Sequence, residues 1–278
     1  MNSISLLTTL DEHYLPQLEV LLTSLAINNP GERISLYLLH SGLSEDAFCG
    51  IRRKCAAYQY SFYPICVDET LFQDAPVTRK YPKEMYYRLL APQLLPETVK
   101  RILYLDPDIL VINPLRPLWE TDLQGNLFAA AAHTRKVELA NSINKLRLGT
   151  EQAYFNSGVL LMDLDACRQQ TDPKTLFRFI EVHQKELLLP DQDVLNALYG
   201  RHILQVEDAL WNYDARNFSS YLLRSNGAYD LQWVMEHTAI LHFCGKSKPW
   251  NRNYFYRFGI LYRHYMQLAQ HTWGSQID

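Results

Sequence analysis

Apolar and polar runs alternate along the first part of the chain in a way that predicts a repeating strand–helix order. Short, β-rich apolar runs lie at 3–10, 34–40 and 60–67, and we expect them to be strands. Between them, residues 15–28 and 44–58 carry apolar residues at helical spacing. Because parallel strands need crossover connections, this order predicts an α/β fold with a mostly parallel central sheet flanked by helices.

The rest of the chain continues the pattern. Further strands are expected at 101–106, at 109–112 and 127–133, which should continue the sheet, at 158–164 in the core, and late in the chain at 238–243. Further helices are expected around 84–93, at 174–187, at 191–200 and, rich in aromatic residues, at about 253–270. The stretch 208–236 has the least regular pattern and predicts a lid or acceptor region. Because no linker or internal repeat interrupts the chain, we expect a single domain over residues 1–278.

Composition and charge exclude several classes of protein. The formal net charge is −3, and a slightly acidic chain without a basic block is a poor candidate for binding nucleic acid. The five cysteines are odd in number and include no C-x-x-C pair, which predicts a reducing, cytoplasmic location. The N-terminus lacks a basic region and is interpreted as a first strand rather than a signal peptide. No apolar run approaches the ~20 residues that a transmembrane helix needs, so only peripheral membrane association stays open.

Two carboxylates, Asp106 and Asp108, lie on either side of Pro107 where the apolar run 101–105 ends. Side chains alternate along an extended backbone, so both carboxylates should point the same way. Two such groups repel each other without a cation, and oxygen ligands suit Mn²⁺ or Mg²⁺. The pair therefore predicts a metal site, and the alternative interpretation is a solvated turn.

His242 ends the last expected strand, and Gly245, Lys246 and Lys248 follow it within one short loop. Glycine allows a backbone to approach a ligand closely, and lysine is a point charge for phosphate. This loop predicts a metal–diphosphate site. A basic surface turn is the alternative.

Six short motifs follow one another along nearly the whole chain, namely TTLDEHY, MYYRL, ILYLDPDILV, YFNSGVLLMDL, PDQDVLN and HFCGKSKPW. Together they resemble glycosyltransferase family 8, the retaining galactosyl- and glucosyltransferases, and in particular the bacterial lipopolysaccharide type. The resemblance implies a GT-A type nucleotide-diphospho-sugar transferase fold. It also implies transfer of galactose or glucose from a UDP-sugar to a glycan or another hydroxyl acceptor, in lipopolysaccharide or cell-surface polysaccharide biosynthesis.

The resemblance also implies roles for individual residues. The metal, Mn²⁺ or Mg²⁺, would be held by Asp106, Asp108 and His242. The UDP-sugar would contact a set of residues spread over all six motifs, namely Thr9, Asp11, Tyr14, Arg88, Asp106, Asn156, Ser157, Asp191, Gln192, Gly245 and Lys248. Asp191 and Gln192 would face the transferred sugar as the catalytic residues. Because Gln192 is a poor nucleophile where a double displacement needs a carboxylate, we favour front-face attack by the acceptor.

Several of these residues have ordinary structural interpretations as well. Tyr14 could simply pack at a helix start, Arg88 could be a surface residue of a helix, and Asn156 could form a turn. Asp191 could be an N-cap after Pro190. Two departures from the family pattern concern the acceptor: Lys80 replaces a histidine, and 187–190 lacks an aromatic residue. Two other functions stay open, a metal-dependent nucleotide-sugar hydrolase and a non-catalytic sugar-binding relative.

Overall fold

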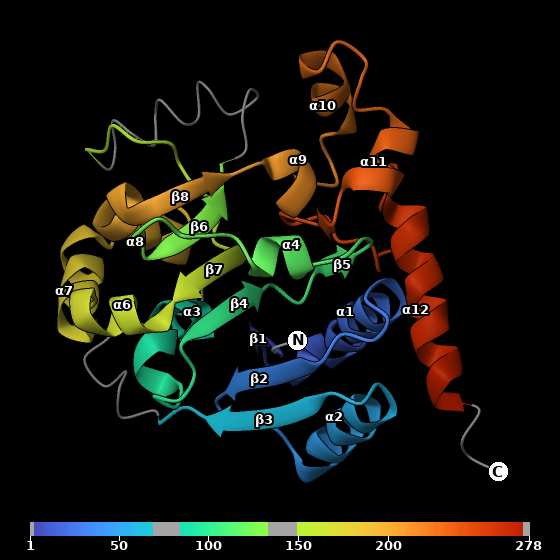
Figure 1. Ribbon diagram of the computed structural model, residues 1–278, viewed down its shortest axis with the longest axis horizontal. Coiled ribbons are helices and arrows are strands. Elements are labelled where there is room, and N and C mark those ends of the chain that lie inside the picture. Colours follow the sequence, from blue (N-terminus) through green and yellow to red (C-terminus); the bar gives the residue numbers. More distant parts are fainter. Residues whose placement is uncertain (1–2, 69–83, 133–148, 275–278) are drawn as a thin grey trace.

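The computed structural model describes residues 3–68, 84–132 and 149–274, and these form two sheets and their covering helices (Figure 1). The main sheet has seven strands, in the spatial order β3 (Ser61–Cys66), β2 (Ile34–His40), β1 (Ile4–Thr9), β4 (Arg101–Leu105), β7 (Val159–Asp163), β6 (Phe128–Ala131) and β8 (Ile203–Val206). Only β7 runs antiparallel to its neighbours, β4 and β6. The predicted α/β class and the mostly parallel sheet are therefore confirmed.

Each strand of the main sheet sends alternate side chains to opposite faces, and each face has its own helices. On β4, Ile102 and Tyr104 join one apolar cluster, whereas Leu103 and Leu105 join the other. The first face is covered by α3 (Glu84–Leu94), α6 (Leu164–Gln170), α7 (Pro173–His183) and α8 (Pro190–Tyr199). The second face is covered by α1 (Leu15–Asn28), α2 (Glu45–Ala57) and α4 (Arg116–Trp119). The period of two along buried strands thus produces the three-layer arrangement.

A smaller sheet of three strands corrects one of the predictions. Its order is β5 (Ile109–Val111), β10 (Ile240–His242) and β9 (Tyr213–Asp214). We expected 109–112 to continue the main sheet, but the turn at Asp106-Pro107-Asp108 redirects the chain, and β5 pairs antiparallel with β10, the late strand expected at 238–243. Local periodicity identified these strands, but it could not identify their partners.

The C-terminal third is more regular than its sequence pattern indicates. The stretch 208–236, predicted to be irregular, contains α9 (Asp208–Trp211), β9, α10 (Phe218–Arg224) and α11 (Leu231–His237). The terminal helix α12 spans Gly259–Gly274 rather than 253–270, because turns occupy the chain up to Gly259. Side chains from α10, α11 and α12 form a third apolar cluster with the small sheet and α1. The strand β8 had not been predicted.

Lys54 of α2 is a buried cation, and its pKa predicts how stability depends on pH. Its Nζ atom lies 3.9 Å from Glu19 Oε2, and burial lowers its pKa to about 8 despite that carboxylate. Above this pH the folded state loses the Lys54 proton while the unfolded chain still holds it. The free energy of unfolding should therefore rise by about 1 kcal/mol between about pH 8 and about pH 9.

Urea unfolding at both pH values checks this expectation, with Lys54→Met as the control variant. The rise should be present in the native chain and absent from Lys54→Met. An equal rise in both proteins would assign it to other groups.

Candidate active site

The two sheets meet at the Asp106-Pro107-Asp108 turn, where β4 ends and β5 begins. The Asp106 backbone N–H donates to the carbonyl of Gly158 at the start of β7, at 2.9 Å. The Asp108 carbonyl accepts from the Phe243 N–H at the end of β10, at 3.1 Å. These backbone hydrogen bonds bring together the C-terminal ends of β4 and β10 and the N-terminal end of the antiparallel strand β7. This place is the carboxyl edge of the sheet, where open α/β sheets bind ligands.

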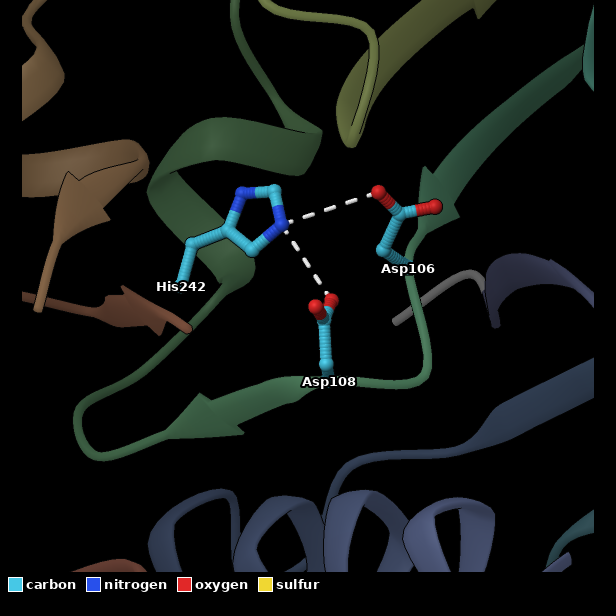
Figure 2. A group of neighbouring side chains, drawn as sticks. All are labelled: Asp106, Asp108 and His242. Carbon is cyan, nitrogen blue, oxygen red and sulfur yellow. Dashed lines mark ion pairs between the residues drawn. The ribbon is translucent and has the colours of Figure 1, made fainter. Parts of the chain in front are cut away.

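Asp106, Asp108 and His242 converge at this edge, as Figure 2 shows. His242 Nε2 lies 3.2 Å from Asp108 Oδ1 and 3.6 Å from Asp106 Oδ2. One ligand atom from each residue lies within 4.8 Å of the others. The predicted convergence of the two aspartates with the distant histidine is therefore present, and the solvated-turn interpretation is wrong because Asp108 is buried.

A chain of hydrogen bonds sets the orientation of the His242 ring. The Gly158 backbone N–H donates to Asn156 Oδ1, so that atom is an acceptor, and Asn212 Nδ2 donates to it as well. Asn212 Oδ1 therefore faces His242 Nδ1 at 2.8 Å, and Nδ1 must carry the proton. This arrangement turns Nε2 toward the two carboxylates, where its unprotonated form could serve as a metal ligand.

Asp108 is buried between two groups that can carry positive charge, Lys248 and His242. Lys248 Nζ donates to its Oδ2 atom and also to the Phe243 carbonyl, the latter at 3.1 Å. Burial alone would raise the pKa of Asp108, but His242 and Lys248 hold it well below its usual range. Its Oδ1 atom is buried and accepts no hydrogen bond among the described residues. A buried, ionised oxygen in this position is suited to hold a cation.

Arg88 of α3 lies beneath the cluster and links it to α8. Its NH1 atom is 3.0 Å from Asp106 Oδ1, 3.2 Å from Asp191 Oδ2 and 3.1 Å from the carbonyl of Ser157. The guanidinium also stacks 4.5 Å from the centre of the Tyr104 ring. Arg88 is buried, so its interpretation as a surface residue of a helix is wrong.

The first turn of α8 contributes Asp191 and Gln192. Asp191 Oδ2 accepts from the Ser157 hydroxyl at 2.8 Å, and Gln192 Oε1 accepts from Asn156 Nδ2 at 3.1 Å. The N-cap of α8 is Leu189, so the N-cap interpretation of Asp191 is wrong. Asn156 donates through Nδ2 to Gln192 and accepts at Oδ1 from Gly158 and Asn212. It therefore does more than form a turn, because it links distant parts of the site.

A cavity of about 700 Å³ opens over these groups. Its lining contains the predicted residues Arg88, Asp106, Asp108, Asn156, Ser157, Asp191, Gln192, His242, Gly245 and Lys248. Lys246 lines it too, as an exposed side chain. Lys80 lies outside the described residues, and so does most of the 78–84 loop that contains it.

Thr9, Asp11 and Tyr14 lie beside the cavity rather than in its lining. Thr9 Oγ1 is 3.3 Å from the Tyr104 hydroxyl, at the end of β1. Asp11 is exposed and caps the 3-10 helix Glu12–Tyr14 by accepting from the His13 N–H at 2.9 Å. The Tyr14 ring meets Trp250 edge-on, 6.2 Å between centres. Tyr14 therefore packs near Lys248, whose Nζ is 5.8 Å from the same Trp250 ring.

Sequence reasoning missed two groups that hold the site together, Asn212 and Tyr104. Asn212 is buried and positions His242 as described above, and the Tyr104 hydroxyl donates to Asp106 Oδ1 at 2.6 Å. Tyr104 could have been found, because it lies two residues before Asp106 on the same face of a strand. Asn212 lies between two aromatic residues in a stretch predicted to be irregular, and no local signal marks it.

Gly158 is the place where the cluster leaves no room for a side chain. A Cβ atom there would clash with the His242 imidazole and come within 2.5 Å of Asp106 Oδ2. We expect Gly158→Ala to displace both groups and to weaken Mn²⁺ binding by about 10- to 100-fold, the range typical of disturbed ligand orientation. Titration with Mn²⁺ followed by electron paramagnetic resonance would measure this loss.

Gly200→Ala is the matched control for this variant, because the three atoms nearest to the new Cβ atom there all belong to the flexible Gln152 side chain. It should bind Mn²⁺ as the native chain does. Native Mn²⁺ affinity in Gly158→Ala would show that crowding at this position does not govern the site.

The chain is similar in sequence to several known proteins. The sequence model described as Glycosyl transferase family 8 matches residues 5–254. General stress protein A of Bacillus subtilis is 29% identical over 268 residues, covering 94% of this chain and 92% of that protein. A lipopolysaccharide 1,2-glucosyltransferase of Escherichia coli is 27% identical over 249 residues, covering 87% of this chain and 71% of the relative.

Solved structures share the fold. The galactosyltransferase LgtC, crystallised with donor and acceptor sugar analogs, superimposes with a TM-score of 0.80 at 22% identity, covering 95% of this chain and 96% of that one. The glycosyltransferase GlyE of Streptococcus pneumoniae superimposes with a TM-score of 0.71 at 22% identity, covering 99% of this chain and 64% of that one. The GT-A type fold expected from the sequence is thereby confirmed.

Proposed function

The chain belongs to glycosyl transferase family 8, and from this premise we propose that it transfers glucose or galactose from a UDP-sugar to a hydroxyl group of a glycan. The observation that carries the proposal is the cluster of Asp106, Asp108 and His242 in the lining of the cavity. The Escherichia coli relative is named a lipopolysaccharide glucosyltransferase, which supports a role in lipopolysaccharide or cell-surface polysaccharide biosynthesis.

Mn²⁺ or Mg²⁺ is the proposed cofactor, and the residues present fit it. Two carboxylates and one imidazole offer ligand atoms within 4.8 Å of one another, and the orphaned Asp108 Oδ1 is suited to a cation. When bound, the metal would neutralise charge on the diphosphate leaving group. Lys248, already held in this cavity, would add a second positive charge at the same place.

The sugar end of the donor is assigned to the groups around α8. Asn156, Ser157, Asp191 and Gln192 line the cavity on the side that Arg88 supports. Their hydrogen bonds to one another fix their rotamers, which preorganises the polar groups that would orient a hexose. Gly245 and Lys248 are assigned to the diphosphate.

The nucleoside end is assigned to Thr9, Asp11 and Tyr14. Asp11 is exposed beside the cavity, and Tyr14 is half-buried against Trp250 near Lys248. We propose that Asp11 accepts a hydrogen bond from the uracil edge and that Tyr14 stacks on the ring.

Retention by front-face attack is the proposed mechanism. Of the two aspartates beside Gln192 in the sequence, Asp191 lines the cavity, and it is held by the Ser157 hydroxyl and the Arg88 guanidinium. A carboxylate engaged in this way is a weak nucleophile, and the Gln192 amide is weaker still. The acceptor hydroxyl would therefore attack directly and pass its proton to the departing phosphate. A glycosyl adduct on Asp191, detected by mass spectrometry of the native enzyme, would contradict this mechanism.

The decisive experiment is a panel of UDP-glucose, UDP-galactose and UDP-GlcNAc with and without Mn²⁺. Thermal unfolding should shift upward for the correct donor only in the presence of the metal, because ligand binding stabilises the folded state. Release of free sugar at one rate with and without glycan acceptors would favour a nucleotide-sugar hydrolase. Sugar binding without any UDP or Mn²⁺ binding would favour a non-catalytic relative.

The proposal extends to the whole chain and its location. We assign residues 1–278 to one domain and the stretch 208–236 to the acceptor side, because Asp214, Arg216 and Asn217 line the cavity. All five cysteines are free thiols, which supports a reducing, cytoplasmic compartment. Among the described residues, no helix combines the length and apolar character that a membrane crossing requires.

A further inference from the structure

Arg216 lines the cavity as a further cation besides Arg88 and Lys248, and none of the six motifs contains it. Its Nε and NH2 atoms donate to the two oxygens of the buried Asp214 carboxylate, at 2.9 and 2.7 Å. Asn217 Nδ2 donates to the same carboxylate at 2.7 Å. These hydrogen bonds with Asp214 also raise the pKa of Arg216 above its ordinary value, so the guanidinium stays charged. Arg216 is therefore rigid and positively charged.

The topology of the small sheet places Arg216 on the far side of His242 from the aspartates. The central strand β10 has β5, which follows Asp108, on one side and β9 on the other. Asp214 pairs in register with His242 on the parallel neighbour, so both side chains lie on one face of this sheet. Lys248 binds Asp108 and lies near Trp250 and Tyr14, on the opposite side. Arg216 and Lys248 thus lie on different sides of the metal cluster.

The third nitrogen of the guanidinium, NH1, does not bind Asp214 and lies beside Gly245 in the cavity lining. NH1 lies against the Cα atom of Gly245, so closely that a Cβ atom there would clash with it. Gly245 also has a φ of +81°, which favours glycine on its own account. Arg216 also lines the cavity, and its side chain is 32% exposed, so a ligand in the cavity can reach the guanidinium. A guanidinium presents its donors in a fork that matches a carboxylate or a phosphate.

We propose that Arg216 binds an anionic group, a carboxylate or a phosphate, carried by the acceptor, and that the acceptor is therefore an acidic glycan. This inference rests on the proposed function. The charge of the donor diphosphate is matched by the metal cluster and Lys248, and the nucleoside end lies beyond Lys248. The side of the cavity that Arg216 occupies is consequently left for the second substrate.

The test measures binding of two matched probes to the enzyme saturated with UDP and Mg²⁺. Methyl β-D-glucuronide carries a carboxylate, and methyl β-D-glucoside is its neutral counterpart. Ligand-observed nuclear magnetic resonance should show the glucuronide binding at least about tenfold more tightly, as expected for one charge-assisted contact. Equal affinities, or a stronger glucoside, would overturn the inference. So would the absence of binding by the glucuronide.

The variant Asp214→Asn/Arg216→Gln removes both charges together, so that no buried carboxylate is left without its cation. It should lose the preference for the glucuronide. Arg257→Gln is the control, because this exposed arginine stacks on Phe218 at 4.4 Å and does not line the cavity. It should keep the preference. A preference that survives in the double variant would remove Arg216 from the site.

A third arm separates the acceptor from the donor. Isothermal titration of UDP with Mg²⁺ should give the same affinity for the native chain and the double variant. A loss of tenfold or more in the variant would place Arg216 on the diphosphate and overturn the acceptor assignment. Failure of the native chain to bind UDP at all would instead sink the proposed function, whereas intact UDP binding with equal probe affinities would sink this inference alone.

Discussion

Replacing Asp108 with asparagine is expected to abolish sugar transfer while leaving the fold intact. The carboxylate offers a buried oxygen to the metal site and accepts from Lys248, and an amide carries no charge for either cation. Loss of one preorganised electrostatic contact reduces turnover by about 10²–10³-fold, and here the metal and Lys248 are both disturbed. The kcat/KM of Asp108→Asn should therefore fall by at least about 10³-fold.

Transfer from the donor identified in the panel would be measured at saturating Mn²⁺, together with Mn²⁺ affinity. Asp46→Asn is the matched control, since Asp46 lies exposed in the first turn of α2, and it should behave as the native chain does. Far-ultraviolet circular dichroism and the unfolding midpoint show whether each variant has folded. A folded Asp108→Asn with full activity would take this residue out of the active site.

The layers of the fold could be predicted because they depend on local patterns. Buried strands such as 34–40 and 101–105 are apolar on both faces, and the helices between them have one apolar side, so each segment carries its own signal. The small sheet could not be predicted, because β5, β9 and β10 have only three, two and three residues. The strand β5 depends on pairing with a strand more than 100 residues away in the sequence, between Val111 and Ile240 for example, and the two residues of β9 depend on pairing with β10.

The candidate site divides in the same way. Asp106 and Asp108 could be found because two carboxylates after an apolar strand carry a cost that predicts a cation. His242 could be found because a glycine and two lysines follow it in one short loop. Asn212, which orients His242, could not be found, because its partners are distant in the sequence. Asn212 acts on His242 only through hydrogen bonds that also involve Asn156, and Arg216 acquires its role from a register pairing. A sequence shows residue types, whereas the function of these residues depends on neighbours that folding supplies.

Arg88→Met should be the most destabilising single change in the site. Arg88 is buried and its NH1 atom contacts carboxylates of both Asp106 and Asp191, so methionine would leave two acidic groups without their shared cation. Removing one partner of a buried ion pair costs about 3–5 kcal/mol, because the remaining charge is still desolvated. We expect the free energy of unfolding to fall by about that amount in metal-free protein, and transfer to be lost.

A second substitution separates this electrostatic cost from a loss of packing. In Arg88→Met/Asp191→Asn one uncompensated charge is neutralised, so urea unfolding should show part of the lost stability restored, with transfer still absent. Arg257→Met, an exposed arginine exchanged in the same way, should leave both quantities near native values. If the double variant were no more stable than Arg88→Met, the loss would come from packing against Tyr104 rather than from the carboxylates. In that case Arg88 would be a structural residue beneath the site, and Asp191 would need another partner to hold it toward the sugar.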